Sequence, residues 1–276
     1  IQSFKVQLTY RQQWIDQRLK FDDMGGQIRF LNVHDISRLW IPDTFFVNER
    51  EGHFHNVMQP NVLVRIYPDG SVLYSIRVSL KLSCPMNFRN YPFDKQQCEI
   101  RAESYGHNAE QLVYLWKEWD PVQVTKVIHT PIFQLVSFQT DYCDVAMSTG
   151  NYSCLKVWFE LERQSSNAIV RVYIPCVMLV ILSWIPLWFN NKSSFVRLLT
   201  PLLVLLVLAS GISQFNLNEA PKTSYTKAVD VWTGICLTFV FAVLMYVASA
   251  DYFTRQERTS SQGKSTTSDG GGKVRL

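Results

Sequence analysis

The residue patterns that mark an enzyme are missing from this sequence of 276 residues. It contains no set of nucleophile, base and orienting group, no glycine-rich loop that could cradle phosphate, and no closed metal site. A strong excess of one charge is missing too, because 27 lysines and arginines stand against 23 aspartates and glutamates. We therefore expect neither an enzyme nor a nucleic-acid partner, and the net charge itself says little about other partners.

A convincing helical period is missing from residues 1–165, where short alternating strands and turns prevail. The first strand places apolar side chains on one face and Thr9 and Arg11 on its polar face. Residues 62–67 and 71–83, joined by Pro68-Asp69-Gly70, predict a hairpin. Many short strands with such turns are typical of an immunoglobulin-like β-sandwich.

Cysteine is sparse, and its six residues are unevenly placed. Four of them form two close pairs in the first region: Cys84 with Cys98, and Cys143 with Cys154. Paired cysteines indicate an oxidising compartment, so we expect residues 1–165 to be an extracellular domain.

Residues 166–252 are mostly apolar. Uncharged runs at 172–189, 198–215 and 231–250 are each long enough to cross a bilayer as a helix. Basic residues between the first two runs and after the third fit the positive-inside rule: Lys192, Arg197, Arg255, Arg258 and Lys264. The second region is therefore predicted to be an all-α transmembrane bundle of a multi-pass plasma-membrane protein.

A signal peptide is missing, and the chain begins at Ile1 directly in a strand pattern. We expect the sequence to be a truncated part of a longer protein. Residues 253–276 are polar and rich in glycine, serine and threonine, which predicts the start of a disordered cytoplasmic segment.

Cys84 and Cys98 enclose the loop PMNFRNYPFDKQQ, with Pro92-Phe93-Asp94 near its middle. This loop resembles the signature loop of the Cys-loop receptors, the pentameric ligand-gated ion channels. Other segments of the sequence also resemble those of this superfamily: RQQWID, LWIPDTFFVNE, VLYSIRVSL, ESYGH, YLWKE, LERQ and KAVDVW. Within the superfamily the chain resembles the anion-selective branch of glycine-, glutamate- and histamine-gated channels, but the fourth membrane helix of that branch is absent.

The resemblance implies a homo- or hetero-pentamer in a postsynaptic membrane, which binds its agonist between subunits. One face of that site would come from Phe46, Glu103, Ser104, Tyr105, Thr149 and Tyr152. The other face would come from Arg11 and Ser75. A guanidinium grips a carboxylate, and aromatic rings and a glutamate attract an ammonium group, so a small amino acid such as glutamate or glycine is expected.

Two surface features suggest modulation. His53 and His55 are two residues apart on an expected strand, so they share a face and could hold one weakly bound zinc ion, as a similar pair does in glycine receptors; polar strand histidines are the alternative. Asn151 begins a glycosylation sequon at the tip of the Cys143–Cys154 hairpin. An occupied sequon would crowd the ligand pocket, although many sequons are unused.

The resemblance also implies how binding is coupled to the pore. Asp94 in the signature loop should lie near Arg163, just before the first membrane helix, and the connection at 219–225, with Lys222, should press against this pair. A surface ion pair is the alternative, worth about 1 kcal/mol or less.

The second membrane segment should line a chloride pore, with Arg197 as a ring that favours anions. Anchored on Arg197, its gate leucine is Leu206, and Leu199 and Leu203 also face the lumen. Anchored on Ser210-Gly211-Ile212, the gate is Leu203 instead, and Thr200 faces the lumen. Such a leucine-rich lumen could dewet, so a non-conducting or regulatory subunit is the alternative to a transmitter-gated chloride channel.

Overall fold

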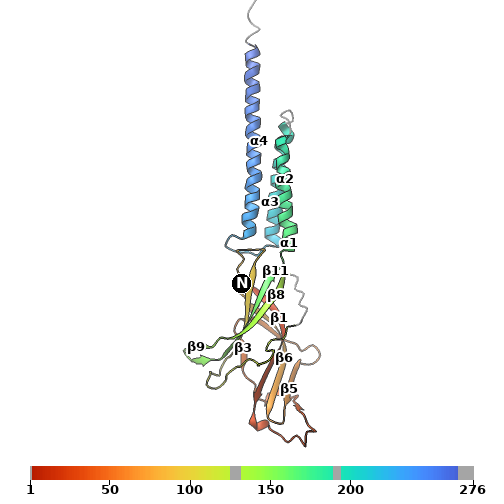
Figure 1. Cartoon of the computed structure of the whole chain (residues 1–276), viewed down its shortest axis with the longest axis vertical. Coiled ribbons are helices and arrows are strands. Elements are labelled where there is room, and N and C mark those ends of the chain that lie inside the picture. The colour runs from red at the N-terminus through yellow and green to blue at the C-terminus, as the bar shows by residue number, and fades with distance from the viewer. Residues whose placement is uncertain (1, 125–131, 189–193, 267–276) are drawn as a thin grey trace, which may run out of the picture. The chain divides into compact units, whose positions relative to one another are not determined.

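The computed structural model describes residues 2–124, 132–188 and 194–266 of the chain (Figure 1). The chain divides into two compact units. The first unit holds Ile1–Met86 and Lys95–Glu162, and the second holds Asn87–Asp94 and Arg163–Leu276. Residues of the loop between Cys84 and Cys98 therefore group with the helices.

The first unit contains a sheet in the order β1-β6-β5-β2, with β4 also paired to β6. All of these pairs are antiparallel. The strands are β1 (Ser3–Ile15), β2 (Leu31–Asn32), β4 (Glu49–Phe54), β5 (Val62–Ile66) and β6 (Ser71–Ser83). Two short 3-10 turns, η1 (Gln17–Leu19) and η2 (Ile36–Arg38), connect strands of this sheet. The β5–β6 hairpin confirms the turn predicted at Pro68-Asp69-Gly70.

A second sheet has the order β3-β7-β11-β8. Its strands are β3 (Thr44–Phe46), β7 (Lys95–Ser104), β8 (Phe133–Tyr142) and β11 (Cys154–Arg163). A separate two-stranded ribbon, β9 (Val145–Met147) and β10 (Gly150–Tyr152), forms the hairpin between β8 and β11.

The core lies between the two sheets because alternate side chains of each strand point inward. Its buried members are Val78, Leu80 and Leu82 of β6, Ile100 of β7 and Val157 of β11. Leu82 is fully buried, and burying a leucine side chain stabilises a fold by roughly 2 kcal/mol. The prediction of an all-β sandwich for the first region is confirmed.

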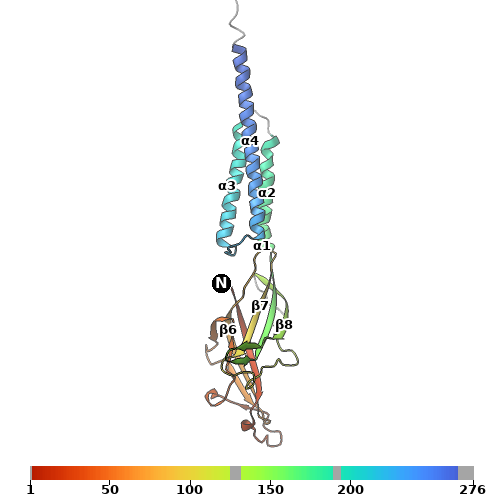
Figure 2. The same ribbon diagram turned by 90° about the vertical axis from the view of Figure 1, so that its left-hand side faces the viewer.

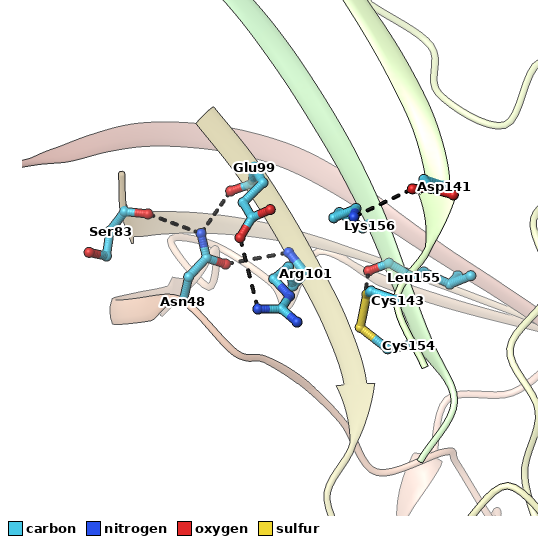
Figure 3. A network of polar contacts seen from close by, with 9 residues as sticks. All are labelled: Asn48, Ser83, Glu99, Arg101, Asp141, Cys143, Cys154, Leu155 and Lys156. Carbon is cyan, nitrogen blue, oxygen red and sulfur yellow. Dashed lines mark hydrogen bonds and ion pairs between the residues drawn. A yellow bond between two sulfur atoms is a disulfide. The ribbon is translucent and has the colours of Figure 1, made fainter. Parts of the chain in front are cut away.

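Asn48 joins the two sheets through its side chain (Figure 3). Its amide nitrogen donates to the carbonyl oxygens of Ser83 on β6, at 3.1 Å, and of Glu99 on β7, at 2.7 Å. Its amide oxygen accepts from the backbone N–H of Arg101 at 3.4 Å. One side chain thereby satisfies three backbone groups, which belong to β6 of the first sheet and β7 of the second.

The second unit is helical. It contains α1 (Ser166–Ala168), the π-helical turn η3 (Ile169–Tyr173), α2 (Ile174–Trp184), the 3-10 turn η4 (Ile185–Trp188), α3 (Ser194–Asn218) and α4 (Ala228–Thr266). Figure 2 shows α2, α3 and α4 side by side. Three stretches are long and apolar enough to cross a membrane: Ser166–Trp188, Phe195–Asn218 and Ala228–Glu257. The three predicted spans are therefore present as helices, each somewhat longer than its uncharged run.

The expectation of disorder from residue 253 is wrong for residues 253–266, which continue α4 without a break. These residues contain no proline, and propagating an existing helix costs far less than starting one. Residues 267–276 and Lys192 lie outside the described residues.

Candidate functional site

Three strands of the second sheet place Glu103 at the centre of a candidate ligand site. Glu103 lies opposite Phe45 on β3 and opposite Cys154 on β11. The ring of Phe45 meets the ring of Tyr105 edge to face, with centroids 5.8 Å apart, and Tyr105 is exposed. Glu103 itself is buried, and this burial raises the pKa of its carboxyl, although nearby Arg101 opposes the shift. A buried carboxylate beside aromatic rings, one of them exposed, can attract an ammonium group.

The expectation for Phe46 differs from the structure. Phe46 packs against the core between the sheets and meets Tyr10 edge to face at 5.6 Å. Neighbouring strand residues point to opposite faces, so the ring on the Glu103 side is that of Phe45. The sequence Thr44-Phe45-Phe46 contains two adjacent aromatic residues. Only the strand register, which the sequence does not show, tells which ring faces Glu103.

Ser104 and Asp43 fix the loop that follows β7. The carboxylate of Asp43 accepts from the Ser104 hydroxyl at 2.7 Å, from the Gly106 N–H at 2.6 Å and from His107 Nδ1 at 3.0 Å. Burial would raise the pKa of Asp43, but these hydrogen bonds outweigh it and lower that pKa to about 2. Ser104 is buried and its oxygen also accepts from the His107 N–H at 3.0 Å, so its hydroxyl organises the loop. Sequence reasoning missed Asp43.

The β9–β10 hairpin stands beside Glu103. The Cys143–Cys154 disulfide closes its base, and the Cys143 N–H donates to the Cys154 carbonyl at 2.9 Å. The Tyr152 hydroxyl donates to the Thr149 hydroxyl at 3.0 Å, so these two predicted residues lie together. Asn151 is exposed. Both predicted disulfides, this one and Cys84–Cys98, are present.

A hydrogen-bonded chain inside the first unit connects β1 with this hairpin. Gln12 of β1 donates to Thr44 of β3, whose hydroxyl pairs with the Tyr114 hydroxyl at 2.7 Å. The Tyr114 N–H in turn donates to the hydroxyl of Ser153 at 3.0 Å. Burial raises the pKa of Tyr114 to about 12, so this hydroxyl stays neutral at physiological pH. Gln12, Thr44 and Tyr114 lie in the segments RQQWID, LWIPDTFFVNE and YLWKE, but nothing in those segments predicted that these side chains contact one another.

The second predicted half of the ligand site lies on the first sheet. Arg11 of β1 and Ser75 of β6 are direct register partners, and Leu63 of β5 continues the same row. Arg11 is exposed, while its neighbours in β1 alternate inward as the sequence predicts. The structure therefore brings Arg11 and Ser75 together, as expected.

His53 is exposed at the end of β4, and His55 follows the strand. A ring nitrogen of His55 lies 2.8 Å from the Ser79 hydroxyl. In the described ranges, no group of three or more histidine, cysteine, aspartate or glutamate residues could hold a metal ion. Zinc at these two histidines stays a prediction.

In the second unit, Asp94 and Arg163 form a buried, bidentate ion pair. Arg163 Nε lies 2.7 Å from Asp94 Oδ1, and Arg163 Nη2 lies 3.2 Å from Asp94 Oδ2. The guanidinium also covers the Tyr91 ring, with its carbon 4.9 Å from the centroid. Asp94 is 2% exposed, so the alternative of a surface ion pair does not hold.

Lys222 is exposed. Contact with the signature loop is instead made by Tyr225, whose hydroxyl accepts from the Phe88 N–H at 2.8 Å. The first residues of α4 add to it, because the Ala228 N–H donates to the Arg89 carbonyl at 2.8 Å. The resemblance suggested Lys222, whereas these contacts are hydrogen bonds with the main chain of the signature loop.

The expectation that Arg197 lines a pore differs from the structure. Arg197 is 6% exposed and lies among the helices of its own chain, 3.6 Å from Asp251 of α4. A charge in an apolar bundle is stabilised by an opposite charge, and the sequence did not show that α4 supplies one. The leucines predicted with Arg197, namely Leu199, Leu203 and Leu206, are exposed on the single chain.

Comparisons with known proteins agree with this geometry. Residues 1–165 match the neurotransmitter-gated ion-channel ligand binding domain, and residues 172–269 match the neurotransmitter-gated ion-channel transmembrane region. The chain is 51% identical over 252 residues to a glutamate-gated chloride channel of Drosophila melanogaster. That match covers 91% of this chain and 55% of the fly protein, so the chain spans little more than half the length of this relative.

The first match covers the first unit together with Asn87–Asp94 of the second unit, and the second match covers most of the helices. They describe a ligand-binding domain outside the cell and segments that cross the plasma membrane, and they do not describe an enzyme. The chain therefore belongs to the neurotransmitter-gated ion-channel family, the Cys-loop receptors that its signature loop resembles.

Proposed function

We propose that the chain is the ligand-binding and pore-forming part of an amino-acid-gated chloride channel subunit, with glutamate as the agonist. The observation that carries the proposal is the placement of two half-sites on opposite sheets. Arg11 and Ser75 lie on the outer face of the first sheet, and Phe45, Glu103 and Tyr105 lie on the second. The outer faces of a sandwich point away from each other, so the halves can meet only across two subunits.

The two halves complement an amino acid. An arginine can bind a carboxylate through paired, charge-assisted hydrogen bonds, and Arg11 offers its guanidinium beside the Ser75 hydroxyl. The opposite half offers aromatic faces and the Glu103 carboxylate for an ammonium group. Glutamate is preferred to glycine because the fly relative bears the name of a glutamate-gated chloride channel.

The pore-lining helix in this proposal is α3. One face of α3 is buried against its own chain: Arg197, Pro201, Val204, Leu208 and Phe215. At 100° per residue, the opposite face carries Leu199, Leu203 and Leu206. This supports the register anchored on Arg197, in which Leu206 is the gate.

A regulatory, non-conducting subunit is the second candidate. The observation that favours it is the ring of leucines on the free face of α3, because an apolar constriction can exclude water and ions.

Voltage-clamped cells that express the full-length subunit test the proposal. We expect glutamate to evoke a current that reverses at the chloride potential, more effectively than glycine, GABA or histamine. Arg11→Ala should raise the half-maximal glutamate concentration by about 10- to 100-fold, the cost of lost hydrogen bonds to a charge. Lys5→Ala is the matched control, because it removes the same charge from the same exposed face of β1.

Cation-carried current would contradict chloride selectivity. Surface expression with glutamate binding but no current would favour the regulatory subunit. Equal effects of Arg11→Ala and Lys5→Ala would remove Arg11 from the site.

A further inference from the structure

At the start of α3, Arg197 joins three helical elements of the second unit. Its Nε donates to the carbonyl oxygen of Pro186 in η4 at 3.2 Å. Its Nη1 lies 3.6 Å from Oδ1 of Asp251 in α4. Both side chains are largely buried, with 7% of Arg197 and 13% of Asp251 exposed.

The Arg197–Asp251 ion pair stabilises the guanidinium charge in apolar surroundings. A guanidinium among apolar helices is costly unless an opposite charge and hydrogen-bond acceptors surround it. Asp251 supplies the charge and Pro186 supplies a carbonyl acceptor. Asp251 therefore stabilises Arg197 in its buried position.

The Arg197 side chain lies on the side of α3 that faces away from the proposed lumen. Leu199 lies two residues along α3, about 200° around the helix, and Leu206 lies nine residues along, about 180° around it. Both leucines are exposed on the single chain, whereas Arg197 is buried. The charge of Arg197 therefore lies on the side of α3 opposite these leucines.

We propose that Asp251 is a positioning residue for Arg197, which holds the guanidinium in the helix bundle and out of the anion path. The inference rests on the proposed channel function. It makes α4 a determinant of the electrostatic field at the cytoplasmic end of the pore. Asp251 lowers the attraction that Arg197 exerts on chloride, both by placing it and by offsetting its charge.

The first test is the current of the full-length channel with Asp251→Asn. Without the Asp251 charge, the guanidinium should move toward the water of the lumen. Chloride leaving the cell should then carry about twofold more current relative to chloride entering it. This change should shrink at high ionic strength, because salt screens charges that face water.

Two variants control this result. Asp251→Glu keeps the charge and should leave the current–voltage curve as in the wild type. Glu257→Gln removes the same charge from an exposed position of the same helix, and should change the curve much less. An unchanged curve in Asp251→Asn, or an equal change in Glu257→Gln, would overturn the proposal.

The second test needs no current. Arg197→Cys and Leu199→Cys are labelled with a charged, membrane-impermeant methanethiosulfonate from the cytoplasmic side of membrane patches. The native Cys176 and Cys236 are buried, and unmutated protein gives their background. We expect the Leu199→Cys thiol to react at least about tenfold faster, because reactivity follows exposure. Similar rates would place position 197 in the lumen and overturn the proposal, even if Asp251→Asn fails to reach the surface.

The two tests separate this inference from the channel function on which it rests. A silent wild type with slow labelling at position 197 counts against the channel function alone. A chloride current with fast labelling at that position counts against the inference alone.

Discussion

Arg163 donates two hydrogen bonds to the Asp94 carboxylate, and its guanidinium lies over the ring of Tyr91. The Arg163 side chain is therefore fixed by an ion pair and by a cation–π contact. Asp94 belongs to the signature loop, and Arg163 is the last residue of β11 and the first residue of the second stretch of the helical unit. The Arg163 N–H also donates to the Asp94 carbonyl at 3.2 Å. The loop and the entry to the first membrane span are therefore fixed to each other at main chain and side chain.

Removing one partner of this pair should be strongly destabilising. Asp94→Asn or Arg163→Gln leaves a buried charge without its partner, which costs about 3–5 kcal/mol. The double variant should cost less than the sum of the single ones, because it leaves neither charge behind. Thermal unfolding of the purified receptor and surface labelling measure both effects.

The exposed pair of Lys95 and Glu162, at 3.7 Å, is the control. Lys95→Ala should change stability by less than about 1 kcal/mol. Strictly additive losses at Asp94 and Arg163 would show that the two side chains do not act as a unit.

The neighbours Phe45 and Phe46 should have separate roles. Phe46→Ala removes a ring that packs against the core, and we expect a loss of about 3–5 kcal/mol with reduced surface expression. Phe45→Ala should spare folding and raise the half-maximal glutamate concentration, because its ring meets Tyr105. Concentration–response curves and surface labelling distinguish the two outcomes, and a reversed pattern would restore Phe46 as the ligand contact.

The sequence predicted the sandwich, both disulfides and three membrane helices, because alternation, cysteine spacing and apolar length are local signals. It also placed Arg11 with Ser75 and Asp94 with Arg163, because these residues lie in segments that resemble the family. It failed where the answer depends on which face a side chain takes. Phe45 and Phe46 have the same chemistry, and only the pairing of Phe45 with Glu103 separates them.

Distant partners were equally hidden. Arg197 suggested a pore ring because a basic residue stood at the start of the second span, whereas Asp251 lies far along the chain and gave no motif. Asp43 was missed for the same reason, and Tyr225 was predicted only as the last residue of the connection at 219–225. Their contacts, with Ser104 and His107 and with Phe88 respectively, join segments that only the fold brings together.

Acid should loosen the loop around Asp43. Its native pKa of about 2 is below the ordinary 3.8, so its hydrogen bonds stabilise the fold fully above pH 4 and are lost as the pH falls toward 2. Because a third of this side chain faces water, we expect about 1 kcal/mol. Asp43→Asn should remove that part of the acid sensitivity in thermal unfolding between pH 5 and pH 2. An unchanged profile would assign the transition to other carboxylates.

Glu103 should give the opposite sign. Burial raises its pKa above the ordinary 4.5, so the native protein holds this proton more tightly than the unfolded chain. Its contribution to stability is present below pH 4.5 and is lost as the pH rises through the native pKa.

In the proposed site the ionised form of Glu103 attracts the ammonium group, so the half-maximal glutamate concentration should rise as the external pH is lowered from 7 toward 5. Glu103→Gln should raise that concentration by about tenfold at pH 7, the loss of one hydrogen bond to a charge, and should flatten its pH dependence. Concentration–response curves across this pH range, with surface expression as the control, measure both effects. A pH dependence that survives in Glu103→Gln would place the titrating group elsewhere, and an unchanged affinity would remove Glu103 from the ammonium site.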